Sequence, residues 1–187
     1  MRTGRLIAVV GPSGVGKDSV IAGLAAADPP LRVVRRTITR APGLGGEAYD
    51  AVTPEAFDAM AARGAFCLHW GAHGLRYGLP AATVDDVRAG ATCLANLSRG
   101  ALKEAADVFP AVTVLNLTAS PDTLAKRLAA RGREETGDIA ARLARSGADL
   151  PDGIDVITLA NDGPLEDTIA RARAALAARP SECELPT

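Results

Sequence analysis

The chain has 187 residues, of which 48% are hydrophobic, 23% charged and 3% aromatic. This length predicts a single domain with a proper hydrophobic core rather than two domains. The formal net charge of -1 argues against a protein that binds nucleic acid or an anionic membrane surface, because such proteins carry an excess of basic residues.

The cysteines and the start of the chain indicate the compartment. Cys67, Cys93 and Cys183 lie far apart, which predicts free thiols rather than disulfides or metal ligands. The apolar run after the basic start is about five residues long, shorter than the ~7–15 residues of a signal peptide. No run approaches the length of a membrane span. We therefore expect a cytoplasmic protein.

Predicted strands and helices alternate along the chain. Short apolar or β-branched runs predict strands at 5–10, 31–37, 65–70, 91–97, 111–118 and 155–160. Longer amphipathic stretches predict helices at 17–27, 54–63, 81–89, 98–107, 121–131, 138–147 and 164–178. This alternation predicts an α/β fold in one domain, with a mostly parallel sheet flanked by helices.

The first predicted strand runs directly into "GPSGVGKDS", which contains the pattern G-x-x-x-x-G-K. Between a strand and a helix, this pattern is typical of a loop that binds nucleotide phosphates. Its glycines let backbone N–H groups converge on the β-phosphate, and the lysine bridges the β- and γ-phosphates. We therefore expect Lys17 to be catalytic and the whole loop to bind ATP: Gly11, Pro12, Ser13, Gly14, Val15, Gly16, Lys17, Asp18 and Ser19.

Asp18 departs from the usual pattern, which has Ser or Thr after the lysine. In the usual loop that hydroxyl binds Mg²⁺, helped by an acidic residue at the end of a neighbouring strand. No interior strand predicted here ends in Asp. One hypothesis is that Asp18 supplies the metal-binding carboxylate from the loop itself, directly or through water. In the alternative, Asp18 only stabilises the N-terminus of the helix, and Ser19 takes the role of the hydroxyl.

Two later segments fit the alternation less well. Residues 38–53 are interrupted by glycine and proline and are too long for a passive connection. Residues 127–145 carry arginines on two predicted helices that a short acidic turn joins. Arginines that close over a transferring phosphoryl group stabilise the charge of the transition state. We therefore expect a lid, with Arg133 and Arg142 catalytic, Arg127 and Arg131 binding the nucleotide, and Arg145 beside them.

The motifs "GPSGVGK", "TITRAP", "HGLRYG", "RLAARGREE" and "VITLAND" occur in the order and spacing of the guanylate kinase superfamily, which residues 5–176 resemble. The resemblance implies that Arg40 grips a phosphate of the acceptor, that Tyr77 lies in the same pocket and that Asn161 lies near adenine. It also implies a P-loop fold in parts: a core at 1–35, 90–126 and 148–178, an acceptor-binding region at 36–89, a lid at 127–147 and a tail at 179–187.

Departures from the guanylate kinase pattern argue against guanine as the acceptor. Gly43 stands where the second phosphate-gripping arginine belongs, and Leu68 stands where the guanine-reading glutamate belongs. The strand end that is of D-x-D type in guanylate kinases reads Asn96-Leu97-Ser98 here. A pocket that reads guanine through buried carboxylates cannot lose both and keep its selectivity.

The polar residues that remain suit a small, highly phosphorylated and hydroxyl-rich acceptor: Arg40, Glu47, His73, Arg76, Tyr77, Ser98 and Arg99. The combination "GPSGxGKDS", "AHGLRYGLP" and "NxSR" is similar to the ribose 1,5-bisphosphate phosphokinases, guanylate kinase relatives associated with phosphonate breakdown. The resemblance implies that ATP, with Mg²⁺, phosphorylates ribose 1,5-bisphosphate to 5-phospho-α-D-ribose 1-diphosphate. The loop of that family also carries Asp after the lysine.

Other interpretations stay open. One is a nucleoside monophosphate kinase with a relaxed base preference. Another is a guanylate kinase-like binding module without catalysis, which the retained Lys17 and the lid arginines disfavour. His69 and His73 have the spacing of a metal pair, but the glycines beside them disfavour a metal site. We expect Trp70 to serve core packing.

Overall fold

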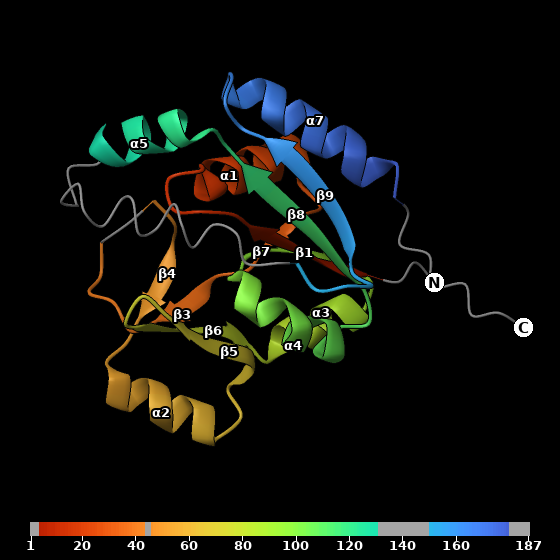
Figure 1. The fold of residues 1–187 in the computed structure, drawn as a ribbon. Helices are drawn as coiled ribbons and strands as arrows, with labels where there is room; N and C mark the ends of the chain where they lie inside the picture. The colour runs from red at the N-terminus through yellow and green to blue at the C-terminus, as the bar shows by residue number, and fades with distance from the viewer. Residues whose placement is uncertain (1–3, 44–45, 131–149, 180–187) are drawn as a thin grey trace, which may run out of the picture.

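The main sheet has the strand order β2-β7-β1-β8-β9 in the computed structural model, which describes residues 4–43, 46–130 and 150–179. All of its pairings are parallel. Its strands are β1 (Arg5–Val10), β2 (Arg32–Val33), β7 (Thr92–Asn96), β8 (Val112–Thr118) and β9 (Asp155–Ala160). The interior strands are continuous apolar runs because helices cover both faces of the sheet (Figure 1).

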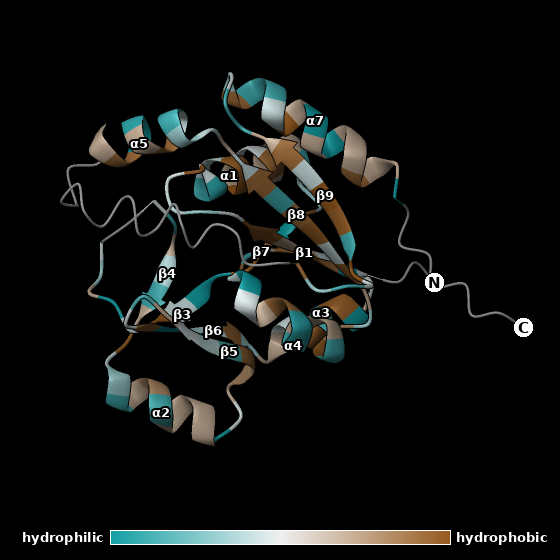
Figure 2. Ribbon diagram, viewed as in Figure 1, coloured by the Kyte–Doolittle hydropathy of each residue, from teal (hydrophilic) through white to brown (hydrophobic). Residues whose placement is uncertain are grey.

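Alternate residues of β1 enter two hydrophobic cores. Ile7 and Val9 pack on the side of α1 (Lys17–Ala27), α5 (Pro121–Ala130) and α7 (Leu165–Ala177). Leu6, Ala8 and Val10 pack on the side of α3 (Ala82–Arg88) and α4 (Leu102–Val108), which the short 3-10 helix η1 (Arg99–Ala101) precedes. Figure 2 shows hydrophobic residues gathered along the strands between these layers. The predicted α/β fold with a mostly parallel sheet is confirmed.

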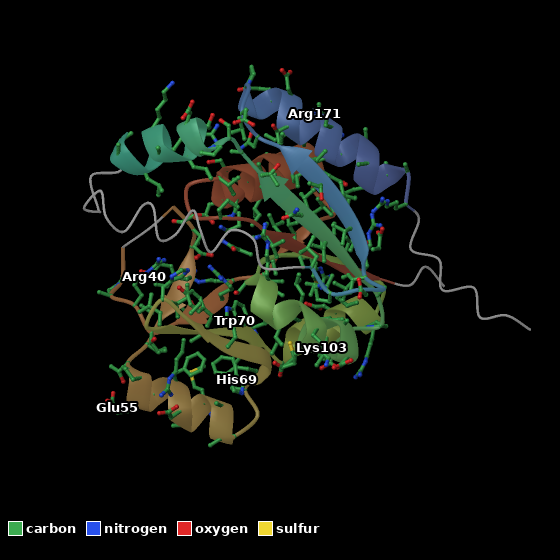
Figure 3. All side chains as sticks on the ribbon, viewed as in Figure 1. Arg40, Glu55, His69, Trp70, Lys103 and Arg171 are labelled. Carbon is green, nitrogen blue, oxygen red and sulfur yellow. The ribbon has the colours of Figure 1, made fainter. Side chains whose placement is uncertain are left out.

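A second, smaller sheet has the order β4-β3-β6-β5 and lies within the predicted acceptor-binding region. Its strands are β3 (Arg36–Ile38), β4 (Tyr49–Ala51), β5 (Phe66–Ala72) and β6 (Leu75–Pro80). On one side it contacts α2 (Pro54–Ala62), where the ring of Phe57 stacks on that of Phe66 at a centroid distance of 4.7 Å. Consecutive residues of a strand face opposite sides, so His69 points toward α2 while Trp70 points toward the main sheet (Figure 3).

The prediction of one strand at 31–37 is wrong. The chain changes sheets within it: β2 pairs with β7 of the main sheet, whereas β3 pairs with β4 and β6 of the second. A run of apolar and basic residues gives no sign of such a change, because both halves have the same composition. The consequence is that Arg36, Thr37 and Ile38 are all buried.

Strands β4 and β6 were missed by the sequence analysis. β5 and β6 form a hairpin whose two turn residues, His73 and Gly74, have φ angles of 54° and 71°. Positive φ at both positions is the requirement of a type I′ hairpin turn, whose right-handed twist matches the strands. The dipeptide "HG" was therefore available as a turn signal.

The predicted helices are largely confirmed. Those at 17–27, 54–63, 81–89, 121–131 and 164–178 correspond to α1, α2, α3, α5 and α7, with ends that differ by at most one residue. The prediction at 98–107 is replaced by η1 and α4. The helix at 138–147 and the arginines Arg131, Arg133, Arg142 and Arg145 lie outside the described residues. None of the helices in the described ranges combines the length and the apolar character that a membrane-spanning segment needs.

Two of the three cysteines lie in the described chain, and both are free thiols packed in or against the core below the main sheet. Burial raises the pKa of the Cys67 thiol to about 11, and it raises the pKa of Cys93 as well. Both thiols therefore stay protonated near neutral pH, as expected of structural rather than reactive cysteines.

Candidate active site

The phosphate loop lies between β1 and α1, at the carboxyl end of the parallel sheet, where open α/β sheets bind their ligands. Gly16 precedes α1 with φ +96°, and a Cβ there would lie 2.8 Å from Nδ2 of Asn161, so the position requires glycine. Nζ of Lys17 donates hydrogen bonds to the carbonyls of Gly11 at 2.9 Å and Pro12 at 3.1 Å. The ammonium group is thereby held over the loop.

The side chains of Asn161 and Arg127 support this loop through hydrogen bonds to its backbone. The carbonyl of Val15 accepts hydrogen bonds from Nδ2 of Asn161 at 2.8 Å and from Nη1 of Arg127 at 3.3 Å. Asn161 is only 2% exposed, and its Oδ1 accepts a hydrogen bond from the hydroxyl of Thr168 at 2.8 Å. Both ends of the amide are thus engaged inside the protein, which makes Asn161 a support of the loop. Its expected place near adenine remains a prediction.

Replacing Asn161 with alanine should lower the free energy of unfolding by roughly 2 kcal/mol or more, because the carbonyl of Val15 and the hydroxyl of Thr168 both lose a buried partner. Thr168→Val is the matched variant. It keeps the hydrogen bond from Asn161 to the carbonyl of Val15, so it should lower the free energy of unfolding by less than Asn161→Ala does. Urea denaturation measures both effects. An Asn161→Ala protein of unchanged stability that no longer distinguishes ADP from GDP would instead assign Asn161 to the base.

Asp18 meets Asn96 at the rim of the loop. Nδ2 of Asn96, the last residue of β7, donates a hydrogen bond to Oδ1 of Asp18 at 2.9 Å, and both side chains line the pocket. Ser19, in contrast, is exposed and outside the pocket lining. A carboxylate beside an amide oxygen is a donor set that suits a hard divalent cation. The sequence analysis named Asn96 only as a departure from the guanylate kinase pattern and gave it no role in the site, although it ends the strand paired with β1.

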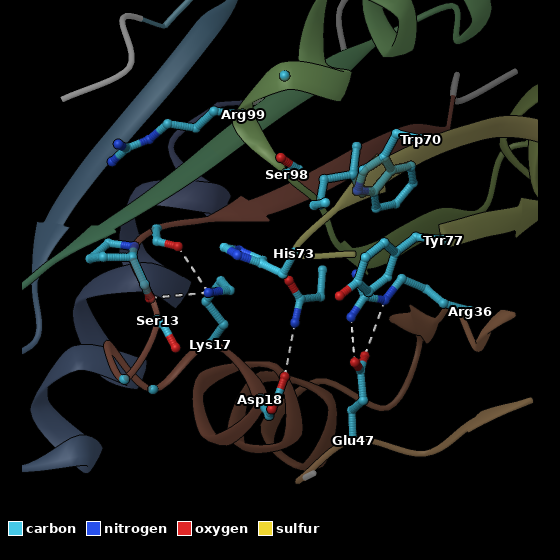
Figure 4. Close-up of a pocket in the computed structure, with 18 of the residues that line it drawn as sticks. Ser13, Lys17, Asp18, Arg36, Glu47, Trp70, His73, Tyr77, Ser98 and Arg99 are labelled. Carbon is cyan, nitrogen blue, oxygen red and sulfur yellow. Dashed lines mark hydrogen bonds and ion pairs between the residues drawn. The ribbon is translucent and has the colours of Figure 1, made fainter. Parts of the chain in front are cut away.

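The far end of the pocket is built around Arg36, which was also missed. Its Nε donates to Oε2 of Glu47 at 3.2 Å, and its Nη2 donates to Oε1 of the same carboxylate. Its guanidinium lies over the ring of Tyr77 at 4.9 Å and that of Trp70 at 5.9 Å. The two rings are themselves stacked, with centroids 5.5 Å apart. Figure 4 shows this group on the side of the pocket away from Ser13 and Lys17.

Arg40 lies next to this group. Its Nη2 is 3.9 Å from Oε1 of Glu47, and its guanidinium lies over the ring of Tyr49 at 4.3 Å. Its Nε and Nη2 atoms are buried and make no hydrogen bond within the described part of the chain. Buried cationic N–H groups ordinarily have acceptors, so this arrangement fits an anionic ligand.

The structure brings most of the predicted acceptor residues into one pocket: Arg40, Glu47, His73, Tyr77, Ser98 and Arg99 all line it. Arg76 does not line it, because on β6 it faces the side opposite Tyr77 and forms an ion pair with Asp58 of α2. Trp70 packs against the core as expected, but it also lines the pocket.

Arg99 is anchored to the main sheet. Its Nη2 donates to Oδ1 of Asn116 at 3.0 Å, and Nδ2 of Asn116 donates to the hydroxyl of Thr158 at 3.2 Å. Its side chain therefore crosses the carboxyl ends of the strands beside the phosphate loop, on the side away from Trp70 and Tyr77 (Figure 4). A cation at that position lies beside the predicted phosphate-binding loop.

The sequence of this chain resembles known proteins over most of its length. The family model described as guanylate kinase matches residues 3–179. A ribose 1,5-bisphosphate phosphokinase PhnN from Ruegeria sp. is 50% identical over 177 residues, which cover 94% of this chain and 93% of that protein. The chain belongs to the ribose 1,5-bisphosphate phosphokinases of the guanylate kinase family.

Other relatives support the same family assignment for this phosphokinase. The protein of the same name from Agrobacterium fabrum is 44% identical over 165 residues, covering 87% of this chain and 90% of that one. Among solved structures, a guanylate kinase from Anaplasma phagocytophilum superimposes with a TM-score of 0.70 at 19% identity, covering 98% of this chain and 89% of that one. That likeness supports the fold alone.

Proposed function

We propose that this phosphokinase transfers the γ-phosphoryl group of ATP to the 1-phosphate of ribose 1,5-bisphosphate, giving ADP and 5-phospho-α-D-ribose 1-diphosphate. The observation that carries the proposal is a single cavity of about 370 Å³ that joins the phosphate loop to an arginine-lined acceptor end. The activity in the names of its relatives supports the same reaction.

The reaction needs positioning and charge neutralisation rather than a general base. An acceptor phosphate is already ionised near neutral pH, since its second pKa is about 6. One of its oxygens attacks the γ-phosphorus, the bond from that phosphorus to the β,γ-bridging oxygen breaks, and ADP leaves with the electron pair. In this proposal the loop N–H groups and Lys17 hold the donor phosphates, while Arg40 holds the acceptor.

The residues present fit Mg²⁺, which we include in the proposal. The carboxylate of Asp18 and the amide oxygen of Asn96 would hold the ion at the rim of the loop. When bound, it would neutralise charge on the phosphate oxygens. Lid residues Arg131, Arg133 and Arg142, with Arg127 of α5, complete the proposed site, and a cytoplasmic location belongs to the same proposal.

A substrate panel followed by ³¹P NMR tests the function. Wild-type protein with MgATP should convert ribose 1,5-bisphosphate, with the signals of ADP and of a new sugar diphosphate rising together. GMP and AMP are the competing acceptors, and they should react far more slowly. Faster consumption of GMP or AMP would favour a nucleoside monophosphate kinase, and no transfer to any acceptor would favour a binding module.

A further inference from the structure

We infer that Arg36 is the specificity-determining residue that binds the second, non-reacting phosphate of the acceptor. The inference rests on the proposed function and deepens it, because it states how the pocket distinguishes a sugar bisphosphate from a sugar monophosphate or a nucleotide.

The position of Arg36 in the pocket is the first argument. The reacting phosphate must lie beside Lys17, where the donor phosphates are held. Arg36 lines the same cavity from β3, and Figure 4 shows it with Glu47 and Tyr77 at the end away from Ser13 and Lys17. An acceptor that spans the cavity therefore presents its far end to Arg36. In ribose 1,5-bisphosphate that far end is the 5-phosphate.

The charge of the far end is the second argument. Arg36 is 6% exposed, and a buried guanidinium is costly unless it is paired. Glu47 accepts from its Nε and Nη2, and among the described residues Nη1 has no hydrogen-bond partner, which leaves its N–H groups for a ligand. The same carboxylate also faces Arg40, so two cations share one anion and the group keeps one net positive charge. This excess suits a phosphate.

The aromatic residues give the third argument. Trp70 and Tyr77 are stacked nearly parallel, at an interplanar angle of 11°, and would otherwise offer a flat surface for a base. The guanidinium of Arg36 lies over the ring of Tyr77 at 4.9 Å and covers that surface. The aromatic pair thus helps to hold the guanidinium in place, and a planar base cannot stack on the face of Tyr77 that Arg36 covers.

The test compares two acceptors that share the reacting phosphate, ribose 1,5-bisphosphate and ribose 1-phosphate. Wild-type protein should prefer the bisphosphate. Arg36→Met should lower kcat/KM for the bisphosphate by about 10- to 100-fold, mainly through KM, because a hydrogen-bonded charge pair is lost. The same variant should change kcat/KM for ribose 1-phosphate little, so the ratio of the two kcat/KM values should fall toward one.

Arg35→Met is the matched control. Arg35 is the neighbouring residue, its side chain is 60% exposed, and it pairs with Asp50 at 2.6 Å outside the pocket. This variant should keep the wild-type preference. Arg36→Lys keeps a charge without the planar fork and should show an intermediate preference.

Arg36→Met leaves the carboxylate of Glu47 buried without its main partner, which can prevent folding. The double variant Arg36→Met/Glu47→Gln removes both charges and tests the inference if the single variant does not fold. Equal losses for the two acceptors, or an unchanged preference in the variants, would overturn the inference, as would a wild-type protein without a preference. A wild-type protein that phosphorylates neither sugar would overturn the proposed function instead.

Discussion

Replacement of Lys17 by methionine is expected to lower kcat by about 10³-fold, which corresponds to about 4 kcal/mol of transition-state stabilisation. Nζ of Lys17 lies over the loop, where it donates to the carbonyls of Gly11 and Pro12. At that position it would meet the charge that develops between the donor and acceptor phosphates. Methionine keeps the length of the apolar stem and removes the charge. Coupled ADP release at saturating ATP and ribose 1,5-bisphosphate measures the change.

Lys103→Met is the control for this substitution, because Lys103 is exposed on α4 and lies outside the pocket. It should leave kcat unchanged. The thermal midpoint of the Lys17→Met protein should stay close to that of the wild type, since the ammonium group lies in the open pocket, where water can replace it at the carbonyls of Gly11 and Pro12. Full turnover in Lys17→Met would contradict the assignment of the loop.

The parts of the site that are local in the sequence could be predicted. The loop at 11–19 carries its signal in its own residues, and the hydroxyl of Ser120 caps α5 as the order Ser-Pro-Asp indicates. The acceptor end of the pocket was harder to predict from the sequence, because it is assembled by pairing between strands that lie far apart in the chain. Tyr77 and Arg76 are neighbours in one motif, yet the alternation of β6 places only Tyr77 in the pocket.

Arg36 shows why the remaining part could not be predicted. In the sequence it is one of two adjacent arginines inside an apolar run, with nothing to distinguish it from the exposed Arg35. Its role depends on the change of sheets between β2 and β3 and on Glu47, which is 11 residues away and reaches it through the loop before β4. Both are long-range features that local patterns do not contain.

The contact between Asp18 and Asn96 predicts that the two residues can be exchanged as a pair. The usual loop has a hydroxyl after the lysine and an acid at the neighbouring strand end. Here the acid is on the loop and the neutral amide is at the end of β7, 2.9 Å away. Asp18→Ser and Asn96→Asp are each expected to lower kcat/KM by about 10²-fold, whereas the double variant should recover to within about 10-fold of wild type because their effects are coupled.

The two single variants should lose activity for different reasons. Binding of Mn²⁺, followed by electron paramagnetic resonance, distinguishes these reasons, because it measures metal affinity independently of turnover. Asp18→Ser removes the carboxylate and should bind Mn²⁺ weakly. Asn96→Asp places two carboxylates side by side, so its thermal midpoint should fall in EDTA and recover when Mn²⁺ is added. The exchanged pair should bind Mn²⁺ with near wild-type affinity.

If Asp18 served only the N-terminus of α1, Asp18→Ser would change stability by about 0.3–1 kcal/mol and leave the affinity for Mn²⁺ intact. Ser19 would then have to hold the cation, and Ser19→Ala would weaken its binding. The structure instead favours Asp18 as the residue that holds the cation, because Asp18 lines the pocket and Ser19 is exposed outside it. Ser19→Ala should therefore bind Mn²⁺ like the wild type, and the metal dependence of the enzyme should follow the carboxylate from position 18 to position 96.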